Sequence, residues 1–388
     1  METEGIPSTV KYMSGLLLFY WLGRGAVWKF LPVFIERHIT SVFLVGLVTS
    51  LPPLVTLLLD IPVSNLVQRA GERIVVLSGL IAGAAPSVLY AGAVPAAIVS
   101  GKVLEGFSKS LTWNGAWSLA LRIPDDDVQS RSNSVFLLGP NLAKVAGPVF
   151  GGFVLVSAGF RPLFAIWGGL GVLGSLAFYR ILGTGRADIR QPLKDLVHGR
   201  TYVDDFRHLR ENFQEMRKPL ALIMTYSIIN SFSWLVIPLV LDKLNASFVE
   251  MGLIFTAAAT PWLLQFGWGS LGDRFGEKKV LTVAGLVTAP VLFWLSTVGS
   301  VALLGAGYIV SRVATNGMSP LIHTLFDAAV PNDQEGEMTG FLELTKHFGQ
   351  FLGPALAGAV SSLYGLSASF LGAGVVALLV AGVAAVDF

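Results

Sequence analysis

The sequence contains no cysteine, and charged residues make up only 13% of its 388 positions. Without cysteine there are no disulfides, thiolate metal sites or cysteine nucleophiles, although the cellular compartment stays open. Also absent are a Gly-x4-Gly-Lys-Ser/Thr phosphate loop, a His-Glu-x-x-His helix and a Gly-x-Ser-x-Gly turn. The five histidines form no metal-binding pattern, and the net charge of +2 gives no indication of a nucleic-acid partner. We therefore expect no ATP-driven motor, no metal, no cofactor and no enzymatic activity.

What the sequence does contain is apolar: 53% of the residues are hydrophobic and the mean hydropathy is +0.66. Apolar runs of about 20 residues recur along the whole chain, which is the length of a transmembrane helix. The runs do not alternate as the strands of a membrane barrel do. The first run is long and contains Arg24, so it is not a cleavable signal peptide. The sequence predicts an all-α polytopic membrane protein embedded in the lipid bilayer.

Apolar runs between polar breaks give twelve predicted transmembrane spans. They cover residues 12–35, 42–66, 74–93, 96–121, 134–157, 162–181, 219–241, 248–271, 280–298, 301–326, 338–362 and 366–386. Residues 182–218 form a long polar segment with mixed charge at helical spacing. We expect this segment to be a cytosolic linker that lies on the membrane surface.

Lysine and arginine predict the orientation of the spans. With the N-terminus inside, the inner loops and tail hold 17 of these residues and the outer loops hold three, namely Arg37, Arg161 and Lys243. Positive residues accumulate on the cytoplasmic side of membrane proteins. We therefore predict a multi-pass protein of the cell membrane, plasma or inner, with both termini in the cytoplasm.

The chain contains an internal repeat. Residues 58–73 match residues 263–278 at an offset of 205, and residues 134–152 match residues 340–358 at an offset of 206. Two matches at nearly one offset indicate a duplication, which is how many secondary transporters are built. The predicted organisation is a six-helix half over residues 1–181, the linker 182–218 and a second six-helix half over residues 219–388.

Three motifs resemble one family. Gly269–Lys279 (GSLGDRFGEKK) is similar to the loop signature of the major facilitator superfamily, although the first-half copy has Gln68 where the family usually has Asp. Lys102-x-x-Glu105-Gly106 resembles its fourth-helix motif, with Lys for the usual Arg and Glu for the usual Gln. The glycine pattern over residues 340–358 resembles the antiporter motif of the drug–proton branch, but that motif normally falls on the fifth helix.

The resemblance covers essentially the whole chain and implies the major facilitator fold, with twelve transmembrane helices in two pseudo-symmetric six-helix halves. It also implies a functional monomer that works by alternating access, and a cytoplasmic latch from Asp273 to the start of the fifth helix near Arg131. Asp273 can in addition accept hydrogen bonds at a helix N-terminus. The Gly-Pro pairs suit either tight packing or bending at a gate. The predicted gating residues are Asp273, Arg274, Gly276, Arg69, Gly71, Arg131, Gly147, Pro148, Gly353 and Pro354.

Charged and polar side chains also lie inside the spans, on single helix faces. At about 100° per residue, Lys102, Glu105 and Lys109 share one face of the span 96–121. Spans 12–35, 219–241 and 301–326 have polar faces too, and in the resembled superfamily the first, fourth, seventh and tenth helices line the central cavity. The predicted substrate-binding residues are Arg24, Trp21, Trp28, Lys109, Trp113, Lys144, Asn230, Trp234, Arg312 and Asn316.

Seven embedded cations face three embedded acids, namely Asp60, Glu105 and Glu343. Each charge at the bilayer centre costs about 2.5–3.5 kcal/mol, so either some lysines are neutral or an anionic substrate completes the site. Structural roles stay open as well: Lys102, Glu105 and Lys109 can pair within one helix, and Glu343 can bridge to Lys346 or Arg312. The residues assigned to proton coupling are Glu105, Lys102, Asp60, Glu343 and His347.

Together these features predict a secondary active transporter for a small organic solute, anionic or amphiphilic, whose partners are that solute and protons. Proton-coupled export is the first hypothesis. A proton-coupled uptake symporter or an anion exchanger is the alternative. A multidrug cation exporter and a lipid flippase are further alternatives.

Overall fold

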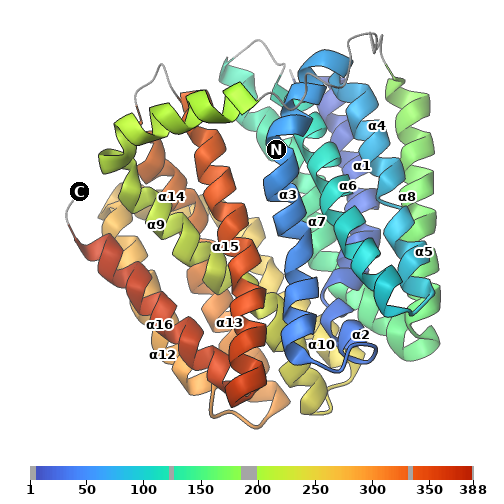
Figure 1. Ribbon diagram of the computed structural model, residues 1–388, viewed down its shortest axis with the longest axis vertical. Coiled ribbons are helices and arrows are strands. Elements are labelled where there is room, and N and C mark those ends of the chain that lie inside the picture. The colour runs from blue at the N-terminus through green and yellow to red at the C-terminus, as the bar shows by residue number, and fades with distance from the viewer. Residues whose placement is uncertain (1–5, 122–125, 185–198, 331–334, 387–388) are drawn as a thin grey trace. The chain divides into compact units, whose positions relative to one another are not determined.

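The computed structural model describes residues 6–121, 126–184, 199–330 and 335–386. Within these ranges every regular element is a helix, as Figure 1 shows. The prediction of an all-α chain is confirmed.

The helices fall into two series that follow the sequence repeat. The first series comprises α1 (Ser8–Trp28), α2 (Leu31–Glu36), α3 (Val42–Ala70), α4 (Glu72–Ala82), α5 (Ala85–Ala91), α6 (Pro95–Leu121), α7 (Asp126–Ala158) and α8 (Phe160–Leu182). The second comprises α9 (Gly199–Lys243), α10 (Phe248–Ala259), the 3₁₀ helix η2 (Thr260–Leu264), α11 (Gln265–Phe275), α12 (Glu277–Leu295), α13 (Val301–Asn316), α14 (Met318–Asp327), α15 (Glu335–Tyr364) and α16 (Leu366–Ala385).

Four of the predicted spans are each built from consecutive shorter helices: α1–α2, α4–α5, α10–η2–α11 and α13–α14. A proline lies in the first turn after the break in each span, at Pro32, Pro86, Pro261 and Pro320. Proline has no N–H, which a first turn does not need, and its ring clashes with a preceding helical turn. Each of the four predicted spans runs across its break, so averaging hydropathy along the span does not reveal it.

Seven of the described helices, with α4 and α5 taken as one, are long and apolar enough to cross a membrane. They are Val42–Ala70, Glu72–Ala91, Arg131–Ala158, Phe160–Leu182, Met216–Lys243, Glu277–Leu295 and Leu366–Ala385. The pair Phe248–Leu263 and Gly267–Phe275, bent by 53°, makes an eighth if it is one span. The four other predicted spans are helical as well, as α1–α2, α6, α13–α14 and α15. All four contain charged residues, which lower their mean hydropathy.

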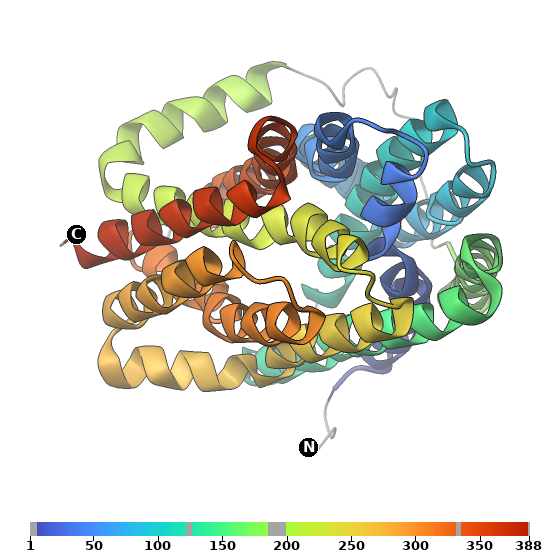
Figure 2. The ribbon, with the colours of Figure 1, turned by 90° about the horizontal axis from the view of Figure 1, so that it is seen from below.

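The chain divides into two compact units. Unit 1 comprises Met1–His38, Val55–Val197 and Ser247–Thr256, and in it α1 packs along α7 and α8 while α4 packs along α6. Unit 2 comprises Ile39–Leu54, His198–Ala246 and Ala257–Phe388. There α15 and α16 lie beside α9, and α16 also packs along α12 (Figures 1 and 2).

The sequence repeat has a structural counterpart in two glycines. Gly71 and Gly276, which are 205 residues apart, immediately precede α4 and α12. Their φ angles are 91° and 86°, in a region that residues other than glycine rarely adopt. These two of the predicted gating glycines are therefore the residues that turn the chain from one helix into the next.

The segment predicted as a linker contributes to a helix. α9 begins at Gly199 and continues without interruption through Pro219 to Lys243, across the predicted boundary at residue 218. Residues 185–198 lie outside the described residues. The organisation into residues 1–181, 182–218 and 219–388 remains a prediction.

Candidate functional site

A buried ion pair joins α1 to α6 in unit 1. Nη2 of Arg24 lies 3.3 Å from Oε2 of Glu105, and the two side chains are 10% and 3% exposed. Nζ of Lys102, one turn before Glu105 on α6, lies 3.3 Å from Oε1 of the same carboxylate. One acid thus serves two cations, and the ionised cluster carries one excess positive charge.

Tyr90 of α5 completes the surroundings of this carboxylate. Its hydroxyl donates a hydrogen bond to Oε1 of Glu105, and its buried ring stacks on Trp167 with centroids 5.9 Å apart. Among the described residues, the partners of Glu105 are Arg24, Lys102 and Tyr90. Pairing within the helix therefore occurs between Lys102 and Glu105, whereas Lys109 is not a partner of Glu105.

Two donors beside this cluster have no acceptor in the described part of the chain. They are Nη1 of Arg24 and Nε1 of Trp21, both buried. The Arg24 guanidinium lies 5.0 Å from the centre of the Trp21 ring, whose edge-to-face neighbour is Trp113 at 6.2 Å. A buried donor without an acceptor costs about 1–3 kcal/mol. A ligand that brings acceptor atoms would remove this cost.

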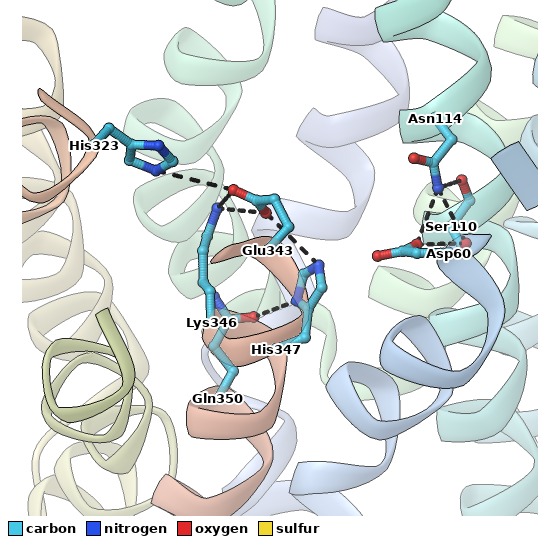
Figure 3. Close-up of polar contacts among 8 residues, drawn as sticks. All are labelled: Asp60, Ser110, Asn114, His323, Glu343, Lys346, His347 and Gln350. Carbon is cyan, nitrogen blue, oxygen red and sulfur yellow. Dashed lines mark hydrogen bonds and ion pairs between the residues drawn. The ribbon is translucent and has the colours of Figure 1, made fainter. Parts of the chain in front are cut away.

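Asp60 of α3 forms a second polar cluster in unit 1 with two residues of α6 (Figure 3). Its Oδ1 accepts hydrogen bonds from the Ser110 hydroxyl at 2.7 Å and from Nδ2 of Asn114 at 2.9 Å. Nδ2 of Asn114 also donates to the Ser110 carbonyl. Two neutral donors of α6, five and nine residues beyond Glu105, thus bind one oxygen of this carboxylate.

The other predicted residues of unit 1 lie on α1, α6 and α7. Lys144 of α7 is exposed and donates to Oδ1 of Asn141 at 3.3 Å. Trp28 is the last residue of α1, and Nζ of Lys29 lies 4.6 Å from its ring centre. Lys109 is half-buried on α6.

In unit 2, Arg312 of α13 is buried and bound by two amides. Its Nη1 donates to Oδ1 of Asn230 on α9 at 2.6 Å, and its Nη2 donates to Oδ1 of Asn316 at 2.5 Å. Nδ2 of Asn230 donates in turn to the Tyr226 hydroxyl at 3.3 Å. The predicted bridge from Arg312 to Glu343 is therefore wrong, because the two amides hold the guanidinium instead. Trp234, one turn beyond Asn230, is half-buried.

Glu343 of α15 is the centre of a further cluster in unit 2 (Figure 3). Both of its oxygens lie 2.8 Å from Nζ of Lys346, which confirms the alternative bridge to that lysine. Nε2 of His323 on α14 and Nε2 of His347 each lie 3.9 Å from a Glu343 oxygen. Nδ1 of His347 is 3.1 Å from Oε1 of Gln350.

The predicted gating residues separate into two groups. Gly147, Pro148, Gly353 and Pro354 are buried inside α7 and α15, whereas Arg69, Arg131, Asp273 and Arg274 are exposed. The expectation that Asp273 lies at a helix N-terminus is wrong. It lies in the last turn of α11, and the following helix begins after Gly276 without a side-chain cap. Asp273 belongs to unit 2 and Arg131 to unit 1, so the latch stays a prediction.

Three residues of the clusters were missed by sequence reasoning. Tyr90 gives no signal in its own apolar segment, since a lone tyrosine at a span end is common at membrane interfaces. Ser110 and Asn114 were recoverable, because they are four residues apart on one face of the charged span.

An apolar cavity of about 520 Å³ lies apart from all of these clusters, between α11, α12 and α13. Its lining includes Trp268, Val283 and Val310, and none of the predicted site residues.

A family model for the Major Facilitator Superfamily matches residues 13–234 and 219–386. The chain belongs to the major facilitator superfamily. The two matched stretches together span both repeats, and the predicted twelve-helix fold in two six-helix halves is confirmed.

Within the superfamily, the chain is similar to multidrug resistance protein MdtG of Escherichia coli, with 25% identity over 385 residues covering 92% of this chain and 90% of that protein. Among solved structures, it is similar to a bacterial homologue of the human lysosomal transporter Spinster, with a TM-score of 0.78 and 15% identity, covering 97% of this chain and 95% of that one. It is also similar to the human organic anion transporter MFSD10 (TETRAN), with a TM-score of 0.69 and 17% identity, covering 97% of this chain and 100% of that one. Membership of this superfamily of transporters supports a secondary transporter embedded in a membrane.

Proposed function

We propose that this protein moves small organic anions across the cell membrane by alternating access and couples that movement to protons through Glu105. The observation that carries the proposal is the Arg24–Glu105 pair, in which a buried guanidinium has one nitrogen on the carboxylate and another without an acceptor. The protein is proposed to act as a monomer.

Glu105 and a substrate anion would compete for the same cations. When Glu105 is ionised, it holds Arg24 and Lys102. When it takes up a proton, two buried cations lose their counter-ion, and an uncompensated buried charge is strongly unfavourable. An anion that approaches Arg24 and Trp21 restores the balance and gives both orphan donors an acceptor. Proton binding and anion binding therefore support one another.

This linkage favours one direction of coupling. Because the proton and the anion are most stably bound together, they would cross the membrane together, as in a proton–anion symporter. Export in exchange for protons is the second candidate. It is favoured by the similarity to a multidrug resistance protein over 92% of the chain and by the antiporter-like glycine pattern.

Three further groups are proposed to take part in proton movement: Asp60, Glu343 and His347. Each belongs to a polar cluster on a helix that also carries, or faces, a substrate-binding candidate. The rings of Trp28, Trp113 and Trp234 would supply apolar surface for the organic part of the substrate.

Lumenal pH in proteoliposomes tests both the coupling and its direction. Purified protein is reconstituted with a pH-sensitive dye inside, and aromatic carboxylates, sulfonates and ammonium compounds are added outside. We expect acidification of the lumen with the anions, since protons enter with them. Alkalinisation would establish exchange for protons, and a response to ammonium compounds alone would establish a cation exporter.

Two variants test whether Glu105 couples proton movement to anion movement. Glu105→Gln should reduce proton movement at least about tenfold and remove its dependence on pH. Since this change leaves two cations uncompensated, Lys102→Gln/Glu105→Gln serves as a folded control, because it restores the wild-type cluster charge of one. Glu250→Gln, an exposed carboxylate at the start of α10, should behave as wild type. Normal proton movement in both Glu105 variants would contradict the proposal, and anion exchange without proton movement would identify an exchanger.

A further inference from the structure

We propose that Arg312, Asn230 and Asn316 form a separate anion site in unit 2, which offers a positive charge and an open N–H donor and binds the carboxylate, sulfonate or phosphate group of the substrate. The inference rests on the proposed function only where it equates the bound anion with the transported solute. Binding of an anion to this site can be measured without transport.

The first observation is a missing counter-ion. Arg312 is 8% exposed, and within the described residues its partners are the two amide oxygens of Asn230 and Asn316. Arg24 and Lys346 differ from it in this respect, since Arg24 pairs with Glu105 and Lys346 pairs with Glu343. Neutral amides solvate a guanidinium but do not cancel its charge. A buried charge of this kind is stable when an opposite charge accompanies it.

The second observation is the orientation of the amides. A guanidinium has five N–H donors and no acceptor, so each asparagine must turn its oxygen toward Arg312 and its NH2 group away. Nδ2 of Asn230 then meets the Tyr226 hydroxyl, which accepts its hydrogen bond. Nδ2 of Asn316 is buried and has no acceptor in the described structure. The arrangement therefore leaves a donor in place for a group that only accepts.

The chemistry of the ligand follows from these two observations. An ionised carboxylate, sulfonate or phosphate presents acceptors alone and carries the missing negative charge. An ammonium group would bring further donors and a second positive charge. A neutral amide would satisfy Asn316 but leave Arg312 uncompensated. In contrast to Arg24, Arg312 does not have to leave a carboxylate before it binds such a group.

One isosteric substitution tests the site. Asn316→Asp supplies the missing carboxylate from within the protein, in a side chain of nearly the same shape. The control is Asn245→Asp, which adds the same charge in the exposed loop between α9 and α10. The probes are 2-naphthoate, 2-naphthalenesulfonate, 2-naphthamide and 2-naphthylmethylammonium, which share one ring system and differ in charge. Binding is measured by equilibrium dialysis in detergent, and folding by thermal unfolding without probe.

We expect the two anions to bind wild type and Asn245→Asp alike. In Asn316→Asp the site at Arg312 should bind them about 10- to 100-fold more weakly, the loss of one charge-assisted hydrogen bond, while binding at Arg24 stays unchanged. Asn316→Asp should unfold at the wild-type temperature or above it, because the introduced carboxylate would pair with Arg312. Equal anion binding by Asn316→Asp, a preference for the amide or the ammonium compound, or no binding by any probe would each overturn the site. The transport proposal would survive the first of these results. Anion binding lost in Asn316→Asp, without anion flux in proteoliposomes, would retain the site and reject the transport proposal.

Discussion

Gly147 and Gly353 occupy equivalent positions in the two repeats, and each lies against the first helix of its own repeat. A Cβ atom at Gly147 would be 2.6 Å from the carbonyl carbon of Gly25 in α1, and one at Gly353 would be 2.8 Å from the carbonyl oxygen of Ile228 in α9. No side chain fits at these distances, so the glycines set how closely the two helices approach. The glycine pattern of the drug–proton branch thus has a packing role in both halves of this chain.

A closer contact between the same helices, α7 and α1, gives the first prediction. A Cβ atom at Gly151 would be 1.9 Å from the carbonyl oxygen of Ala26, so Gly151→Ala must push α7 away from α1. We expect the free energy of unfolding to fall by about 1–3 kcal/mol, measured by denaturation in detergent. Gly372→Ala in α16 is the control, because no atom lies within 4 Å and alanine favours the helix. Equal stability of the two variants would show that α1 and α7 are not held this closely.

Trp21→Phe should weaken the binding of an organic anion without changing the stability of the protein. The substitution removes a buried N–H that has no acceptor, and this gain of about 1–3 kcal/mol offsets the smaller ring. We therefore expect unchanged stability and at least about fivefold weaker binding of 2-naphthoate. Trp117→Phe, whose ring stacks on Trp113, removes the same area without an orphan donor and should lower stability instead. A larger loss of stability in Trp21→Phe than in Trp117→Phe would contradict the orphan donor.

The Asp60 cluster predicts a cost for removing one donor. Asn114→Leu keeps the branched shape of the side chain but deprives the carboxylate of a hydrogen bond of 2.9 Å. Hydrogen bonds to charged groups contribute about 1.5–3 kcal/mol, and thermal unfolding should show a loss of that size. Asp60→Asn/Asn114→Leu should recover part of it, since a neutral amide needs that donor less. A double variant less stable than the single one would disprove this assignment.

Neutralising the pair on α15 should affect function more than folding. Glu343 and Lys346 are 36% and 26% exposed, and ion pairs with this much access to solvent contribute about 0–1 kcal/mol. We expect Glu343→Gln/Lys346→Gln to unfold within about 1 kcal/mol of wild type while the pH dependence of transport changes. Unaltered pH dependence would leave Glu343 with the structural role of a bridge and remove it from the proton path.

The predicted orientation can be tested cleanly because the chain has no cysteine of its own. Tyr364, at the end of α15, and Phe275, at the end of α11, are both exposed. In intact cells, a membrane-impermeant maleimide should label Tyr364→Cys and should reach Phe275→Cys only after the cells are opened. The opposite pattern would reverse the topology.

Sequence patterns predicted the contacts between side chains that lie three residues apart on the same helix. The side chains of Lys102 and Glu105, of Glu343 and Lys346, and of Asn141 and Lys144 meet because residues three apart share a face. Asn141 and Lys144 even correspond, at an offset of 206, to His347 and Gln350, which are also bonded.

Such patterns could not predict the contacts between different helices. The pairing of Arg24 with Glu105, rather than with a ligand alone, depends on the rotation of α1 against α6, which periodicity within either helix does not fix. The same holds for Arg312, whose partner on α9 is an asparagine and not the carboxylate of α15. Hydropathy also passed over the break before Pro86, because the residues that flank it are as apolar as those of a continuous helix.

The division of the chain into units has a mechanical consequence. α3 belongs to unit 2 up to Leu54 and to unit 1 from Val55, while α10 belongs to unit 1 up to Thr256 and to unit 2 from Ala257. A helix that belongs partly to one unit and partly to the other must bend near the boundary whenever the units move. In α3 the adjoining residues are Pro52 and Pro53, which lack the N–H groups that stiffen a helix, and α10 passes into a 3₁₀ turn three residues beyond its crossing. Under the proposed alternating access, bending would concentrate in these two short stretches, which hold no charged residue.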